Sequence, residues 1–266
     1  MDEQVSVDPG RITEHLDAAE RALDAAAVSD PTAEQQAAID DLRALVASFR
    51  DLTSALEAMA AGFDGLRVGI GQFENQEFET AASTFESATT SFERAGGAIE
   101  DATADAGRLE SEGTDASVSE YRDSLSDLEA LTAAGSSLSE GTRLLSLAFD
   151  RFFVAAEAYD DGAYESAIEP FGTARDYAAE GVTAYAAPDE LPPDVGGSIA
   201  SLQCSAENLR DGADHYQQAA EAGANGNTES RRDHEEQAAA ALNRDCGGAG
   251  DRAATVRRAA RLAVAR

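Results

Sequence analysis

The stretch from Ile39 to Phe73 decides the fold class, and it reads IDDLRALVASFRDLTSALEAMAAGFDGLRVGIGQF. Its large apolar residues recur at steps of three or four, a spacing that places them on one face of an α-helix. They are Ile39, Leu42, Leu45, Phe49, Leu52, Leu56, Met59, Phe63, Leu66, Ile70 and Phe73. Nowhere does the chain show the sustained alternation of Val, Ile and Thr that is typical of strands. The sequence therefore predicts an all-α protein of tandem antiparallel helical hairpins.

About eight helices are expected, because the same spacing continues on both sides of this stretch. Asp30 and Pro31 predict a helix start, with Asp30 as the N-cap and proline in the first helical position. Gly135 and the two serines after it could interrupt the second long helix, although continuity is favoured. The expected helices cover residues 11–28, 31–73, 77–104, 118–159, 163–186, 194–224, 228–244 and 251–266.

The chain repeats itself at an interval of 86 residues. Between Asp41 and Ala88, 13 of 48 residues are identical to those found 86 positions later, with no gap. A turn and its flanking aromatic residues stay in register, which favours duplication of a hairpin. The predicted segments are an N-terminal helix (1–30), hairpin repeat 1 (31–104), hairpin repeat 2 (117–186), a degenerate hairpin repeat 3 (194–246) and an Arg-rich C-terminal helix (250–266), expected to form one continuous domain.

The segment YDDGAYESAIEPFGTA, from Tyr159 to Ala174, resembles a tetratricopeptide repeat at the end of its first helix, its turn and its second helix. Gly162 lies at the turn, and Gln76 replaces it in hairpin repeat 1. Hairpin repeat 1 shares the remaining pattern through Gly69, Phe73, Phe78, Ala81, Phe85 and Ala88. The resemblance implies stacked hairpins, here with extended first helices, and binding of a peptide in a groove.

The groove is expected to be apolar. Some members of that family clamp a terminal carboxylate with polar residues, whereas the corresponding positions here hold Leu66, Ile70, Phe152 and Ala156. A carboxylate clamp is therefore not expected in this chain. The candidate partner-binding residues are Leu66, Ile70, Phe149, Phe152 and Phe153. Packing in the core is the alternative role for these side chains, and it is the usual one for aromatic residues at helical spacing.

Charge is the strongest feature of the composition. The chain has 51 acidic and 20 basic residues, all of the latter Arg, and a formal net charge of −31. The carboxylates of such a chain repel one another and require screening, and at ~1 M salt the Debye length is only ~3 Å. The composition resembles that of cytosolic proteins of extremely halophilic archaea, which implies a cytoplasmic protein surrounded by hydrated K⁺. No leader is expected in the start MDEQVSVDPG, and no apolar run reaches the ~18 residues of a membrane span.

Two cysteines flank the last predicted turn at similar distances. Cys204 lies 22 residues before Gly226 and Cys246 lies 20 after it, so an antiparallel hairpin brings them close together. His215 and His234 are opposed for the same reason. Two buried free thiols are expected in a reducing compartment, and a disulfide is the alternative if the Cα atoms lie within ~7 Å. These four residues cannot share one metal ion, since Cys204 and His215 are ~16 Å apart along a helix.

No catalytic motif supports an enzyme: the sequence lacks a Walker loop, a dinucleotide-binding glycine pattern, a nucleophile elbow and a di-iron helix signature. We expect a non-enzymatic scaffold or adaptor that binds another protein through its groove, without a cofactor or metal. Self-assembly into a structural protein, and a thiol redox or metal sensor using the two cysteines, are the alternatives.

A basic patch in the last helix is expected to dock on the acidic body rather than on nucleic acid. It comprises Arg252, Arg257, Arg258 and Arg261.

Overall fold

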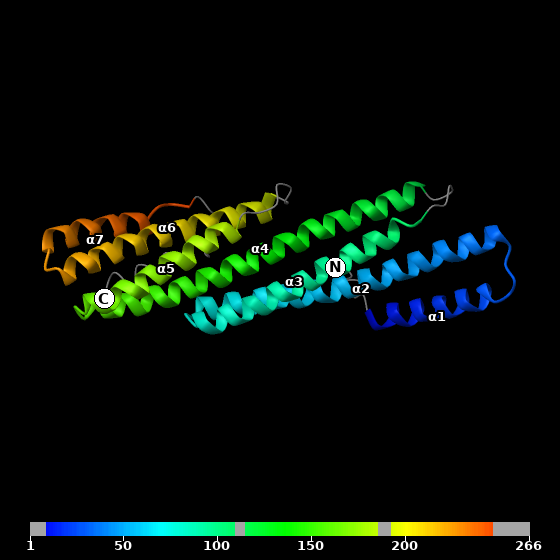
Figure 1. Cartoon of the computed structure of the whole chain (residues 1–266), viewed down its shortest axis with the longest axis horizontal. Helices are drawn as coiled ribbons and strands as arrows, with labels where there is room; N and C mark the ends of the chain where they lie inside the picture. The colour runs from blue at the N-terminus through cyan, green and yellow to red at the C-terminus, as the bar shows by residue number, and fades with distance from the viewer. Residues whose placement is uncertain (1–8, 110–114, 186–192, 247–266) are drawn as a thin grey trace, which may run out of the picture. The chain divides into compact units, whose positions relative to one another are not determined.

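The structure is a computed structural model that describes residues 9–109, 115–185 and 193–246. Within these residues it contains helices and no strand, so the all-α prediction is confirmed. The expected helix 251–266 and its arginines lie outside the described residues. The described helices are α1 (Pro9–Ala27), α2 (Ala33–Glu74), α3 (Phe78–Ala106), α4 (Asp115–Asp160), α5 (Tyr164–Ala184), α6 (Pro193–Ala224) and α7 (Thr228–Leu242) (Figure 1).

The chain divides into two compact units. The first contains the described residues up to Phe63 together with Thr90–Ala133, and the second contains Asp64–Thr89 and the described residues from Ala134 onwards. The divisions fall inside α2, α3 and α4. Helix α4 is uninterrupted through Gly135, and the hydroxyl of Ser139 donates a hydrogen bond of 2.8 Å to the carbonyl oxygen of Gly135 one turn earlier.

The core of the first unit combines alanines with a few larger apolar side chains from α2, α3 and α4. Small residues allow helices to approach closely, and the larger side chains fill the spaces that remain. The buried Ser48 hydroxyl donates a hydrogen bond of 2.7 Å to the Ala102 carbonyl oxygen and lies 2.8 Å from the Tyr121 hydroxyl. The core consists of Ala55, Ala58, Met59, Ala95, Ile99, Ala102, Ala106 and Leu125.

Helix α1 lies against α2 through an apolar face, but none of its residues is fully buried. Arg50 of α2 donates hydrogen bonds to Asp17 at 2.8 Å and to Glu20 at 3.0 Å. Exposed ion pairs of this kind contribute about 0–1 kcal/mol and weaken as salt screens them. The half-buried face of α1, and not its charge, therefore provides most of its attachment; this face consists of Ile12, Leu16, Ala19 and Leu23.

The prediction that α2 starts with Asp30 as N-cap is wrong. Asp30 has a φ of +60°, and the helix begins at Ala33. Thr32 is the capping residue, because its hydroxyl accepts a hydrogen bond from the Gln35 amide at 3.3 Å while the Gln35 side chain accepts one from the Thr32 amide at 2.9 Å. This reciprocal capping box satisfies two amides at the helix start, which outweighs the advantage of proline in the first turn.

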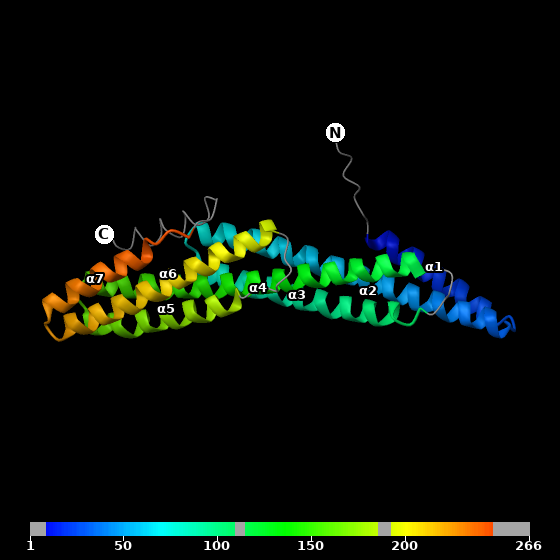
Figure 2. The same ribbon diagram turned by 90° about the horizontal axis from the view of Figure 1, so that it is seen from above.

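In the second unit, α5, α6 and α7 lie side by side with alternating direction (Figures 1 and 2). The ring pair Phe73–Phe78 has centroids 5.3 Å apart and an interplanar angle of 72°, and the pair Tyr159–Tyr164 has 5.1 Å and 69°. The pairs are 86 residues apart in the sequence, and each brackets a turn between two helices. The same edge-to-face contact therefore recurs at the interval of the sequence repeat.

Three helix–helix turns in the second unit are closed in the same way. Gln76, Gly162 and Gly226 have φ values of +64°, +76° and +70°. In each turn the next residue donates an amide hydrogen bond to the carbonyl five residues before it, as Ala163 does to Ala158 at 2.9 Å. This is a Schellman cap, in which glycine adopts a positive φ without steric cost. Gln76 adopts the same conformation and therefore carries that steric cost.

We predict that Gln76→Gly raises the free energy of unfolding by about 1 kcal/mol, because a side chain in the left-handed region costs about 1–2 kcal/mol. The reverse change in the equivalent turn, Gly162→Gln, should lower it by a similar amount. Chemical denaturation followed by circular dichroism measures both values. If Gln76→Gly is neutral while Gly162→Gln destabilises, the Gln76 side chain stabilises the turn by contacts that compensate for its conformation.

Candidate functional site

A pocket of about 380 Å³ lies in the second unit, with α4 along one side and α7 along the other. We call it the α4–α7 pocket. It brings four aromatic rings together with three carboxylates and one guanidinium group. Its lining residues are Phe152, Ala156, Tyr159 and Asp160 of α4, Phe171 of α5, Tyr216 of α6, and Arg232, Glu235, Glu236 and Ala239 of α7.

The four rings pack tightly on one another. Phe171 and Tyr216 are stacked, with centroids 5.3 Å apart and an interplanar angle of 14°. Phe152 and Tyr159 each meet the Tyr216 ring at 75° with centroids 5.8 Å apart. Edge-to-face and offset-stacked pairs are the favourable arrangements of aromatic rings. The cluster therefore links α4, α5 and α6 and gives the pocket a rigid apolar wall.

Polar groups of α7 and α4 form the remaining lining. The Tyr159 hydroxyl donates a hydrogen bond of 2.7 Å to Glu235 Oε1, and Arg231 donates one of 2.7 Å to the same oxygen. Burial, reinforced by the Glu235 carboxylate, raises the pKa of Tyr159 well above its ordinary value. The Tyr159 hydroxyl therefore stays protonated as a donor at neutral pH, and it holds Glu235 in a fixed position.

Tyr216 differs from Tyr159 because its hydroxyl makes no hydrogen bond to any residue that the structure describes. Burial, together with the negative charges of Glu235 and Asp160, raises the pKa of Tyr216 to about 12. A neutral phenol can donate one hydrogen bond and accept others. The pocket therefore contains one hydroxyl group that is available to a ligand.

A larger cavity of about 1010 Å³ lies in the first unit, bordered by α1, α2 and α3. Its arginines are already paired: Arg43 with Asp24 at 2.7 Å, Arg50 with Asp17 and Glu20, and Arg108 with Asp105 at 2.6 Å. These are mostly exposed pairs around a cavity to which no aromatic ring contributes. The α4–α7 pocket is the stronger candidate, because it combines a rigid apolar wall with a few polar groups.

The five predicted groove residues do not line one surface. Phe152 lines the α4–α7 pocket, whereas Phe149 and Phe153 stack on Phe78 with centroids 5.7 and 5.5 Å away. Leu66 is buried and Ile70 is half-buried, and neither lines this pocket. Packing, the alternative role considered from the sequence, describes the position of Phe149 and Leu66. Tyr159, Phe171, Tyr216 and the acidic residues of α7 were not identified as site residues from the sequence.

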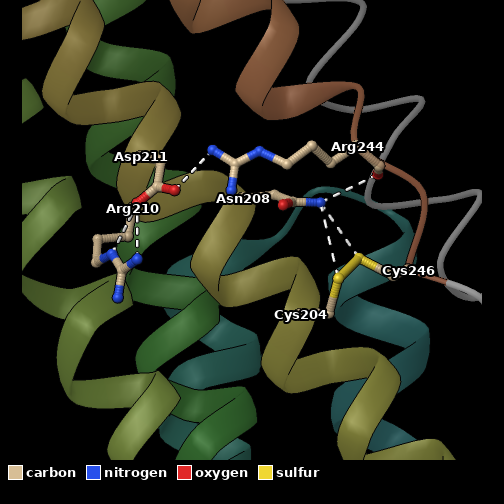
Figure 3. A network of polar contacts seen from close by, with 6 residues as sticks. All are labelled: Cys204, Asn208, Arg210, Asp211, Arg244 and Cys246. Atoms are coloured by element: carbon tan, nitrogen blue, oxygen red, sulfur yellow. Dashed lines mark hydrogen bonds and ion pairs between the residues drawn. A yellow bond between two sulfur atoms is a disulfide. The ribbon is translucent and has the colours of Figure 1, made fainter.

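Cys204 and Cys246 form a disulfide that joins the first half of α6 to the segment after α7, with Cα atoms 5.6 Å apart (Figure 3). The expected proximity of the two residues is present. The expectation of two free thiols is not met, because the hairpin brings the backbones within bonding distance. Reducing compartments keep most thiols reduced, so the disulfide argues against the expected cytoplasmic location.

Polar groups surround this disulfide. Asn208 donates hydrogen bonds to the Arg244 carbonyl oxygen at 3.1 Å and to Cys246 Sγ at 3.2 Å (Figure 3). Asp211 accepts hydrogen bonds from Arg210 at 2.7 Å and Arg244 at 2.6 Å. Burial acts to raise the pKa of Asp211, but the two guanidinium groups outweigh it and the pKa is lowered. Hydrogen bonds and a covalent bond thus fix the end of α7 to α6.

His215 and His234 are opposed across the α6–α7 hairpin, with stacked rings whose centroids are 6.1 Å apart. Each Nδ1 atom is buried without a hydrogen-bond partner among the described residues. No group of three or more His, Cys, Asp or Glu side chains in the described part of the chain is arranged to hold a metal ion. No described helix has an apolar stretch long enough to cross a membrane.

Neither family models, nor curated proteins, nor solved structures gave a match to this chain. The resemblance to tetratricopeptide repeats therefore depends on the residues quoted for it alone.

We predict that reduction of the disulfide lowers the free energy of unfolding by about 2–4 kcal/mol, the usual contribution of such a bond. Thermal unfolding with and without a reductant measures the change. The double variant Cys204→Ser/Cys246→Ser should unfold at the lower temperature in both conditions. Mass spectrometry after alkylation of the denatured, unreduced protein is the direct test, and alkylation of both cysteines would contradict the bond.

Proposed function

We propose that the chain is a non-enzymatic interaction module of tetratricopeptide-like hairpins that binds a partner protein at the α4–α7 pocket. The pocket is the observation that carries the proposal. Rigid aromatic walls with a few placed polar groups are typical of protein-binding hot spots. The proposed role replaces the broad apolar groove expected from the sequence with a smaller, partly charged site that retains only Phe152 of its residues.

The proposed setting is a highly saline medium, and the disulfide argues against a reducing cytoplasm. Support comes from the net charge of −31 and from the use of Arg as the only basic residue. Concentrated salt screens the repulsion among the carboxylates at distances beyond a few ångströms. Binding in such a medium depends on burial of apolar surface and on short-range contacts, both of which the α4–α7 pocket offers.

Filling the pocket should abolish partner binding without unfolding the protein. Ala239 lines the pocket and is half-buried, while its neighbour Ala240 is exposed and does not line it. We predict that Ala239→Leu loses a partner that wild type and Ala240→Leu both retain in affinity capture at native salt. Circular dichroism checks that both variants stay helical. Retention of all partners by Ala239→Leu would contradict this location of the binding site.

Self-assembly is a second candidate, supported by one observation in the first unit. Leu42, Leu56 and Phe63 of α2 are 49%, 44% and 43% exposed although they are large and apolar. With Phe49, which is 38% exposed, they recur every seven residues, the interval of one position of a coiled-coil heptad. A second copy of the chain could cover this stripe.

If the stripe mediates self-assembly, sedimentation equilibrium at native salt should show an oligomer of the wild-type chain. The double variant Leu56→Gln/Phe63→Gln should raise the dissociation constant of this oligomer roughly tenfold or more. The control is Ala60→Gln, an exposed change on the same helix. A wild-type monomer at all measured concentrations would exclude this candidate.

A further inference from the structure

The charges that line the α4–α7 pocket favour a positively charged ligand. Asp160, Glu235 and Glu236 supply three negative charges, Arg232 supplies one positive charge and Arg231 neutralises Glu235, which leaves a balance of −1. Glu235 is already engaged by Arg231 and Tyr159. Among the residues that the structure describes, Asp160 and Glu236 form no ion pair. Their two carboxylates are therefore available to a ligand, and they stand at the border of an aromatic wall.

The aromatic wall favours an organic cation over a simple ion. Aromatic rings attract cations, and guanidinium and alkylammonium groups are bound in this way. A small inorganic ion gains less binding energy from such a wall, because the ion would have to lose its water shell to contact the rings. The pocket volume of about 380 Å³ is sufficient for a side chain or a small ligand.

The protein itself binds a guanidinium group in this manner next to the pocket. The Arg231 guanidinium carbon lies 5.6 Å from the centroid of the Tyr164 ring, and its Nη1 atom lies 2.7 Å from Glu235. A ring and a carboxylate thus hold one guanidinium between α5 and α7. The α4–α7 pocket offers the same two groups, rings and carboxylates, and Arg232 is the one cationic residue in its lining.

We propose that the α4–α7 pocket binds a basic side chain of the partner protein, the guanidinium group of arginine or the ammonium group of lysine. The aromatic wall contacts the apolar stem of the side chain, Asp160 and Glu236 pair with its charge, and the Tyr216 hydroxyl accepts a hydrogen bond from it. This assignment rests on the proposed function, because it names the part of the partner that enters the site.

Binding of Nα-acetyl-arginine amide to the full chain tests the proposal. Nα-acetyl-citrulline amide has nearly the same shape and no charge, so it serves as the matched probe. Nuclear magnetic resonance of ¹³C-labelled aromatic rings follows the titration. We expect the arginine probe to bind about tenfold more tightly than the citrulline probe, a difference of ~1.4 kcal/mol. Equal affinities, or no shift of the pocket rings, would overturn the proposal.

Paired variants show whether the charge acts at the pocket. Asp160→Asn/Glu236→Gln removes the two available carboxylates, and we expect it to weaken binding of the arginine probe roughly fivefold. Asp161→Asn/Glu229→Gln makes the same change in charge at exposed positions that do not line the pocket, and less than a twofold effect is expected. Equal losses in both variants would overturn the assignment of the site.

Two further measurements separate this proposal from the proposed function. Tetramethylammonium, added as a third probe, should bind no more tightly than the arginine probe; much tighter binding would overturn the partner side chain in favour of a free organic cation. Capture experiments with Ala239→Leu test the protein partner independently. A partner captured at the pocket without binding of the arginine probe would leave the proposed function standing and overturn the basic side chain.

Discussion

The stack of Phe171 on Tyr216 is the contact on which the second unit depends. It joins α5 to α6, and the edges of Phe152 and Tyr159 add α4 to the same cluster. Because these rings are almost completely buried, their packing sets the distances among the three helices. Helix α7, held to α6 by its hairpin turn and the disulfide, forms the other side of the α4–α7 pocket.

Features that depend on short-range sequence could be predicted. The spacing of apolar residues identified the helices, and Gly162 and Gly226 identified two turns, because backbone conformation there is decided within a few residues. The start of α2 could not be placed in this way. Asp30 and Thr32 are both good capping residues, and only the reciprocal bond with Gln35 favours Thr32.

The α4–α7 pocket depends on contacts between distant segments and was not predicted. Tyr159 and Glu235 are 76 residues apart, and no local pattern connects them. One signal was present in the sequence: hairpin repeat 1 has Phe73 and Phe78 where hairpin repeat 2 has Tyr159 and Tyr164. A hydroxyl gained at a buried aromatic position indicates a polar partner, and Glu235 is that partner for Tyr159.

The distances of the two cysteines from the last turn predicted that they lie close together. Sequence spacing does not show, however, whether the two thiols are oxidised to a disulfide.

The disulfide has a mechanical consequence. It closes a loop between residues 42 positions apart, so a force applied to the two ends of the chain bypasses most of the α6–α7 hairpin. At about 3.4 Å per residue, roughly 140 Å of contour length is withheld from extension while the bond is intact. One wall of the α4–α7 pocket lies inside this loop. Tension on the chain would therefore separate α4 from its neighbours before α7 could be drawn away from α6.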